Sequence, residues 1–199
     1  MRDDAVGSTR SGHYGVAGTG VALAEATIAA AWNVQGDPAR SPLVEEARRL
    51  FGVALPVAPN TTACRAGVAA LWLGPASWLV VGGAASSFGG YAAARDALNA
   101  AGAALFDVSA SRVAWTLSGP HAADVLAKGC PLDLHPRAFA AGACAQSLYL
   151  HVNLLIEKRD DAPTFVVLIA RSFARDVWRA LSQASAQYGY EVRAPAPFA

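Results

Sequence analysis

The sequence predicts an α+β protein in which helices and antiparallel strands follow one another along the chain. Some segments alternate apolar and polar residues, as half-buried strands do, and others place apolar residues every three or four positions, as amphipathic helices do. Composition is the third observation. Of the 199 residues, 54% are hydrophobic and only 16% are charged, which allows one large domain or two small ones with a sizeable core.

The second half of the chain has the clearer pattern. Residues 112–119 alternate as a strand, and residues 119–129 predict a short helix with Pro120 in its first turn and Gly129 at its end. Residues 145–158 predict one long, half-buried strand.

Within that long strand, Leu148 and Leu150 are expected on the buried face. The helix that follows is expected to have Ser172 as its N-cap and Phe173 and Val177 in its apolar stripe. The remaining elements of this half are a central strand, that helix and a short closing strand, at residues 164–170, 173–188 and 189–195.

The first half repeats this order. Residues 41–52 predict a helix, with Ser41 as its N-cap, Pro42 at its first position and Gly52 at its end. The other elements are a strand, a hairpin of two strands, a helix and a strand, at residues 26–34, 66–74, 77–83, 86–102 and 103–109.

Both halves therefore predict the order β-α-β-β-α-β, the ferredoxin-like unit in which two helices cover one face of an antiparallel sheet. We expect a single domain over residues 21–199, built from two pseudo-duplicated halves at about 21–110 and 111–199. Residues 1–20 are rich in glycine and predict a flexible N-terminal arm rather than a signal peptide.

Charge and hydropathy exclude several classes of function. The net charge of +1 argues against nucleic-acid binding, and no apolar stretch is long enough to cross a membrane. The three cysteines are odd in number and irregularly spaced, and no export signal precedes them. We therefore expect reduced thiols in a cytoplasmic protein.

The segment KGCPLDLHP, residues 128–136, places a thiol, a carboxylate and an imidazole close together. Zinc sites need three or four ligands, commonly in paired spacings that this segment lacks. A thiol nucleophile would need an orienting partner, and a helix C-terminus raises a thiol pKa rather than lowering it. A loop for packing or for a partner is favoured, and the candidate interface residues are Cys130, Pro131, Asp133, His135 and Arg137.

Other polar clusters predict turns rather than catalysis. Asp107, Ser109, Ser111 and Arg112 are expected to form a turn with an Arg–Asp pair. The glycine-rich segments lack the spacing of a phosphate-binding loop. We assign no catalytic, cofactor-binding or metal-binding residue to the chain.

Three segments carry a resemblance to a known family: LWLGPASWLVV, the run from FDVSASRVAW to GACAQSL that contains LAKGCPLDLHPRAF, and ARSFARDVW. Together they resemble the gamma subunit of bacterial heterotetrameric sarcosine oxidase. The similarity extends from about Pro42 to Glu191. It implies a fold like the folate-binding domain of the glycine-cleavage aminomethyltransferase, although residues 142–155 lack the acidic residues that work on folate there.

The resemblance also implies a function for the whole complex. Such a complex oxidatively demethylates sarcosine to glycine, releasing formaldehyde or methylene-tetrahydrofolate together with hydrogen peroxide. FAD, FMN, NAD, tetrahydrofolate and zinc are implied on the partner subunits, and none on this chain. This chain is expected to be a non-catalytic subunit that contacts the large flavin-binding subunits. The alternatives are a stand-alone folate-binding or one-carbon-transfer protein, and a thiol or metal enzyme that uses Cys130 and His135.

Overall fold

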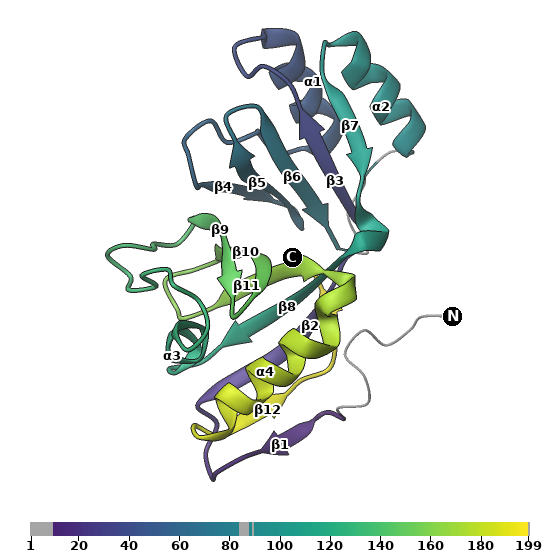
Figure 1. The fold of residues 1–199 in the computed structure, drawn as a ribbon. Helices are drawn as coiled ribbons and strands as arrows, with labels where there is room; N and C mark the ends of the chain where they lie inside the picture. Colours follow the sequence, from purple (N-terminus) through teal and green to yellow (C-terminus); the bar gives the residue numbers. More distant parts are fainter. Residues whose placement is uncertain (1–9, 84–87, 89, 199) are drawn as a thin grey trace. The chain divides into compact units, whose positions relative to one another are not determined.

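The chain forms two compact units in a computed structural model that describes residues 10–83, 88 and 90–198 (Figure 1). Unit 1 combines the residues up to Ala26 with Val113–Ala196, and unit 2 combines Thr27–Arg112 with the residues from Pro197. Within the expected N-terminal arm, residues 1–9 lie outside the described part, while Gly12–Tyr14 form a strand.

Unit 2 follows the expected order of elements with one strand added. The hairpin predicted around residues 74–77 is confirmed, and the added strand β4 precedes it. The elements are β3 (Ala30–Gln35), α1 (Ser41–Phe51), β4 (Thr62–Arg65), β5 (Val68–Gly74), β6 (Ser77–Gly82), α2 (Tyr91–Ala100), β7 (Ala104–Asp107) and the 3-10 turn η1 (Ser109–Ser111).

The sheet of unit 2 is antiparallel, in the order β4-β5-β6-β3-β7. Helices α1 and α2 pack on one face of it (Figure 1). Helix α1 contributes Leu43, Ala47 and Phe51, which recur every four residues and so share one face of the helix. Alternate residues of the strands, among them the fully buried Trp78, complete this core.

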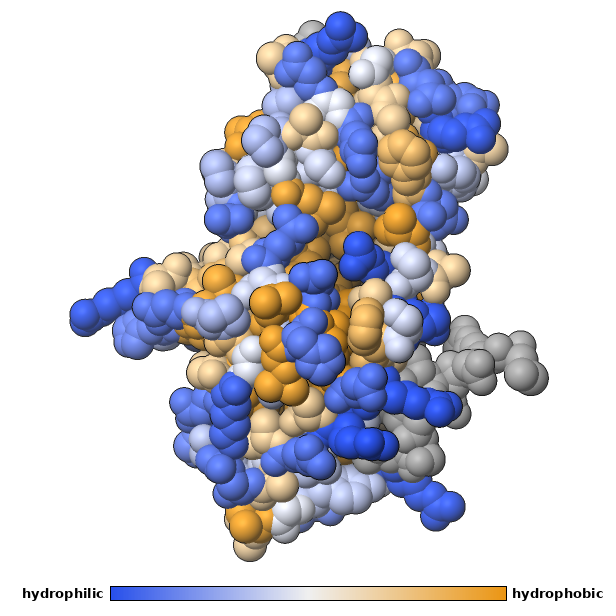
Figure 2. Space-filling model, viewed as in Figure 1, coloured by the Kyte–Doolittle hydropathy of each residue, from blue (hydrophilic) through white to orange (hydrophobic). Residues whose placement is uncertain are grey.

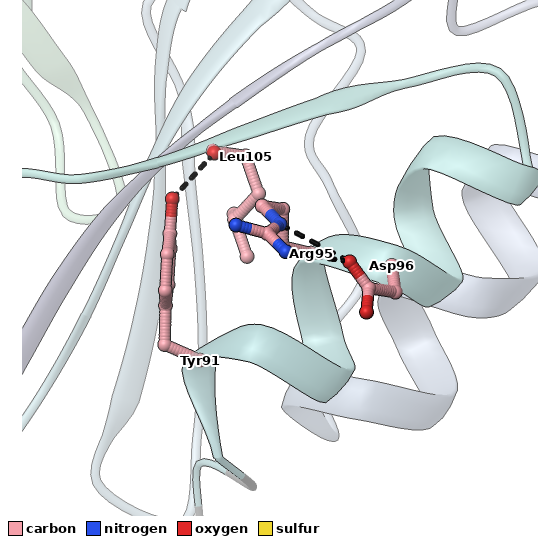
Figure 3. Close-up of polar contacts among 4 residues, drawn as sticks. All are labelled: Tyr91, Arg95, Asp96 and Leu105. Atoms are coloured by element: carbon pink, nitrogen blue, oxygen red, sulfur yellow. Dashed lines mark hydrogen bonds and ion pairs between the residues drawn. The ribbon is translucent and has the colours of Figure 1, made fainter.

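Helix α2 is fastened to the edge of this sheet by a side chain (Figure 3). The Tyr91 hydroxyl donates a 2.8 Å hydrogen bond to the Leu105 carbonyl on β7, the last strand of the sheet. On the outer side of the helix, Arg95 forms an ion pair of 2.9 Å with Asp96. Residues 84–87 and 89, where this helix was expected to begin, lie outside the described part of the chain.

Unit 1 has the same order of elements, preceded by two strands. Where one long strand was expected over residues 145–158, the chain forms β9 and β10, so β9, β10 and β11 separate its two helices. The elements are β1 (Gly12–Tyr14), β2 (Val21–Thr27), β8 (Arg112–Ser118), α3 (Ala122–Ala127), β9 (Cys144–Tyr149), β10 (Val152–Lys158), β11 (Phe165–Ala170), the 3-10 turn η2 (Arg171–Phe173), α4 (Ala174–Ala186), β12 (Tyr190–Val192) and β13 (Ala196–Pro197).

The sheet of unit 1 is mixed, in the order β1-β12-β2-β8-β11-β10-β9. Strand β11 lies in its interior, as its continuous apolar sequence predicted. Strand β2 pairs parallel with β12 and antiparallel with β8. Because of this pairing, the residues up to Ala26 belong with the second half of the chain, whereas residues from 21 onward were expected in the first half.

A hairpin turn at Leu150 and His151 divides the strand that was expected to be continuous. Tyr149 pairs with Val152 across this turn, so Tyr149 takes the core face. Leu148 and Leu150, expected to be buried, are 40% and 55% exposed. Leu150 has a φ of 55°, and its N–H donates a 2.7 Å hydrogen bond to the Gly129 carbonyl.

Helices α3 and α4 cover one face of the sheet of unit 1. Helix α4 contributes Val177, Trp178 and Leu181 to the core, and Trp178 packs against the fully buried Trp115 with ring centroids 5.8 Å apart. Helix α4 begins after the 3-10 turn that contains Ser172, so the predicted Ser172 cap is not formed. None of the described helices is both long and apolar enough to cross a membrane.

Candidate interface loop

The candidate loop leaves helix α3 through a close backbone contact. After α3 ends at Ala127, the N–H groups of Gly129 and Cys130 donate to the Leu126 carbonyl at 3.1 and 2.8 Å. A Cβ at Gly129 would lie 2.9 Å from the buried Tyr149 ring. The glycine therefore lets the loop backbone pass directly over this ring.

The loop is divided into buried and exposed positions. Cys130, Leu134 and Phe139 are buried in the core of unit 1, and Leu132 is partly buried against it. The exposed positions include four of the five candidate interface residues: Pro131, Asp133, His135 and Arg137. The loop thus has an apolar side that fixes it and a polar side that faces solvent.

Backbone contacts occupy the carboxylate and one nitrogen of the imidazole. An Asp133 carboxylate oxygen accepts the His135 N–H at 2.9 Å, which confirms the predicted turn. The Nδ1 atom of His135 accepts the Arg137 N–H at 3.2 Å. An imidazole that accepts at Nδ1 carries its proton at Nε2. These two side chains therefore shape the loop, and the Arg137 side chain extends from it.

The Cys130 thiol contacts a hydroxyl rather than the imidazole. Its Sγ lies 3.7 Å from the Ser147 Oγ on β9, and no bond joins it to His135. Burial, with a smaller contribution from Cys130, raises the pKa of the nearby Tyr149 hydroxyl to about 12. The Tyr149 hydroxyl therefore keeps its proton at neutral pH. Within the described ranges, no group of three His, Cys, Asp or Glu side chains is placed to hold a metal ion.

The second polar cluster, in unit 2, forms a turn, as expected. The Ser109 N–H and hydroxyl both donate to the Asp107 carboxylate, and the Ser109 hydroxyl also accepts the Ala31 N–H at 2.9 Å. The described contacts of the Asp107 carboxylate are these bonds to Ser109, and the expected pair with Arg112 stays a prediction. The cluster ties η1 to β3.

Sequence reasoning missed two exposed apolar positions in unit 1. Leu150 lies at the hairpin tip, and its N–H donates a hydrogen bond to the carbonyl of Gly129 at the start of the candidate loop. Phe173, expected in the core, is 42% exposed at the start of α4. Figure 2 shows hydrophobic and hydrophilic residues side by side over the visible part of unit 1. The alternation of residues 145–158 had placed Leu150 on the buried face, and the helical spacing of residues 173–188 had placed Phe173 in the core.

Known structures identify the class of fold first. The glycine cleavage system aminomethyltransferase T from Bartonella henselae matches with a TM-score of 0.57 over 89% of this chain and 48% of that chain. The identity is 15%, so this likeness defines the fold alone. The class of the protein is thus an α+β fold similar to that of aminomethyltransferase T.

The sequence then defines the family. The profile of the family described as "Sarcosine oxidase, gamma subunit family" matches residues 35–187, and the chain belongs to this family. A chain of the heterotetrameric sarcosine oxidase from Corynebacterium sp. U-96, in complex with pyrrole 2-carboxylate, matches with a TM-score of 0.73 and 29% identity. That match covers 87% of this chain and 88% of the other.

Relatives with the same description align over shorter segments. Sarcosine oxidase subunit gamma of Arthrobacter sp is 36% identical over 51% of this chain and 49% of its own length. The subunit of Corynebacterium sp. (strain P-1) is 31% identical over 63% of this chain and 60% of its own length. The chain thus spans about half of the length of the first of these relatives and three fifths of the second.

Proposed function

We propose that this protein is a non-catalytic assembly subunit of a cytoplasmic heterotetrameric sarcosine oxidase, in contact with the larger flavin-binding subunits. The observation that carries the proposal is the match to a chain of the Corynebacterium heterotetramer over 87% of this protein. The complex would convert sarcosine, water and oxygen to glycine, formaldehyde and hydrogen peroxide. With tetrahydrofolate, methylene-tetrahydrofolate would take the place of formaldehyde.

The geometry of the candidate loop supports a structural role. Cys130 is buried against Ser147, and Asp133 and His135 accept backbone N–H groups of their own loop. Groups engaged in this way hold a surface in one shape, which lowers the entropy lost when a partner binds. The exposed residues, Pro131 and Arg137 among them, would then contact that partner.

The cofactors of the complex belong to the partner subunits in this proposal. FAD, FMN, NAD, tetrahydrofolate and zinc would be bound there, and this chain would act by covering apolar surface of the assembly. A subunit of this kind raises the stability of its partners by mass action, since it binds their folded forms.

Removal of the chain tests the proposal. The larger subunits are expressed with and without this protein, and assembly is followed by size-exclusion chromatography with light scattering and by sarcosine-dependent oxygen uptake. We expect the protein to elute with the larger subunits and the complex without it to lose activity faster on warming. Separate elution, together with an equally stable and active enzyme, would contradict the proposal.

The loop is tested within the same complex. Arg137→Glu reverses an exposed charge whose side chain makes none of the described bonds that hold the loop. We expect the dissociation constant to rise about tenfold. Arg48→Glu, on the exposed side of α1, is the matched control and should change it by less than about twofold.

The alternative expected from the sequence, a stand-alone folate-binding or one-carbon-transfer protein, stays open to test. Such a protein would share the fold that this chain has in common with aminomethyltransferase T. Titration calorimetry of the isolated chain with tetrahydrofolate separates the two proposals. A dissociation constant of about 1 μM, which corresponds to about 8 kcal/mol of binding free energy, would favour the alternative. If about 0.1 mM protein gives no heat of binding, the alternative is contradicted and the assembly role is favoured.

The order of elements supports a duplicated origin. Unit 2 runs from β3 to β7 and unit 1 from β8 to β12, each as strand, helix, strands, helix and strand. The units have β4, β5 and β6, or β9, β10 and β11, between their helices, where two strands were expected. We include in the proposal that both descend from one unit of this enlarged ferredoxin-like kind.

A further inference from the structure

The outer side of helix α4 and the turn before it carry a positive patch around an exposed aromatic ring. Phe173 ends the turn η2 and is 42% exposed. Arg171 in the turn and Arg175 and Arg179 on the helix are all exposed. In the same stretch Asp176 is the one acidic residue, so the described patch has a net charge of +2.

These arginines are placed against the local electrostatics of the helix. Arg175 is the second residue of α4, and a cation in the first turn opposes the helix dipole. Arg179 lies four residues further along, directly above Arg175 on the helix surface, where two like charges repel. Neither arginine has an ion pair in the part of the chain that the structure describes.

Each of the other two long helices in the described part of the chain has at least one exposed arginine with an acidic partner. On α1, Arg49 pairs with Glu46 at 2.6 Å in the last turn, where the dipole favours a cation. On α2, Arg95 pairs with Asp96 at 2.9 Å. A surface that only needs to be soluble uses such mixed charges. Helix α4 instead places Arg175 and Arg179, which have no described ion pair, next to an exposed Phe173, and exposed arginine and aromatic side chains are enriched at interface centres.

We propose that Phe173, Arg175 and Arg179, with the neighbouring Arg171, form a docking surface for an acidic patch with an apolar centre on a larger subunit of the oxidase complex. This inference rests on the proposed function, because the partner is a subunit of that complex. An acidic partner supplies the charges that α4 lacks and relieves the repulsion between its arginines. The Phe173 ring would enter the apolar centre, where its burial adds affinity.

The test uses the full-length chain and the assembled larger subunits. The double variant Arg175→Glu/Arg179→Glu is compared with the wild type by biolayer interferometry at several salt concentrations. The matched control is Arg48→Glu/Arg65→Glu, which makes the same change of charge at exposed positions of unit 2. Phe173→Ala is a third variant, chosen because the side chain is exposed and not part of the core.

We expect the double variant to raise the dissociation constant at least about tenfold and to lose most of its salt dependence. Phe173→Ala should raise it about tenfold as well, and the control should change it less than about twofold. The melting temperature of the isolated double variant should stay close to that of the wild type, because the favourable effect of an acid in the first turn offsets the like-charge repulsion that persists between the two positions. Lost binding with an intact melting temperature therefore reports the interface and not the fold.

Failure of this inference is distinct from failure of the proposed function. If the wild-type chain does not bind the larger subunits, the proposed function is wrong. If the wild type binds and the double variant binds equally well, or if the control weakens binding as much, the function stands and the docking surface is wrong. Self-association of the wild type that the double variant abolishes, without any change in binding to the larger subunits, would assign the surface to a second copy of this chain and overturn the proposal.

Discussion

The two units share an order of elements and differ in what they leave exposed. In unit 2, Arg49 on α1 and Arg95 on α2 have acidic partners, and Tyr91 bonds to the last strand of the sheet. In unit 1, the arginines of α4 form no ion pair among the described residues, and Leu150 and Phe173 are exposed. Since unit 2 pairs an arginine on both α1 and α2 within the same order of elements, the unpaired arginines of α4 are a property of the local sequence and are not required by the fold.

The largest expected difference between the units lies beneath α2 and α4. Trp178 on α4 is 5% exposed and packs on Trp115, whereas α2 buries Ala94 and Leu98. We expect Trp178→Ala to lower the free energy of unfolding by about 4 kcal/mol and Leu98→Ala by about 3 kcal/mol, because each leaves a cavity. Urea denaturation measures both. A smaller loss for Trp178→Ala than for Leu98→Ala would show that α4 depends less on its core face than α2 does.

Alkaline pH should weaken unit 1 through Tyr149. Burial raises the pKa of this hydroxyl to about 12, above its unfolded value of about 10. The folded state holds the proton more tightly than the unfolded state. The contribution of this proton to the free energy of unfolding, roughly 2–3 kcal/mol, is therefore fully present below pH ~10 and is lost as the pH rises towards ~12. The difference in unfolding free energy between the wild type and Tyr149→Phe, measured from pH 9 to 12, should fall over this window. A constant difference would contradict the assignment.

The glycines that follow α1 and α3 sharpen the comparison further. Gly52 has a φ of 67° with open space around it, whereas Gly129 faces the buried Tyr149 ring at 2.9 Å. We expect Gly129→Ala to cost on the order of 2 kcal/mol through steric overlap, and Gly52→Ala about 1 kcal/mol through backbone strain. Thermal unfolding of both variants checks the order, and the reverse order would mean that the Tyr149 ring moves aside easily.

The smallest expected effect belongs to the edge of unit 2. Tyr91→Phe removes the hydroxyl that bonds to the Leu105 carbonyl at 2.8 Å and keeps the ring. We expect a loss of about 1 kcal/mol, the typical value for one such bond. Arg95→Ala, which breaks only the exposed pair with Asp96, is the control and should change stability by less than about 0.5 kcal/mol. Equal losses of unfolding free energy in the two variants would mean that the Tyr91 hydrogen bond stabilises unit 2 no more than the exposed ion pair does.

The sequence predicted features that local chemistry determines. Gly52 ends α1, and Asp133 forms the turn expected of it, because both depend on residues within a few positions. Features set by distant contacts were missed. A two-residue turn at Leu150 preserves the alternation of a strand, so the pattern concealed the hairpin. Helical spacing likewise assigned Phe173 to the core, although the helix begins one residue later.

The sheet that β2 joins could not be predicted from local patterns either, because its partner strands are distant in the sequence. Its residues alternate as in any strand, and only the distant β8 and β12 decide which sheet it joins. In the candidate loop, the Asp133 turn was predicted from local chemistry. Cys130 was grouped with the candidate interface residues, but it is buried and contacts Ser147 on a separate element, which local patterns could not predict.

The turn at Leu150 also bears on the sequence of folding events. Leucine rarely adopts a φ of 55°, so the residue at the tip of this turn does not itself favour the reversal. The carbonyl of Gly129, twenty-one positions earlier in the chain, accepts the Leu150 N–H and supports the reversal. We therefore expect the pairing of β9 with β10 to form locally, and the turn at Leu150 to be stabilised further once the preceding helix and loop have docked.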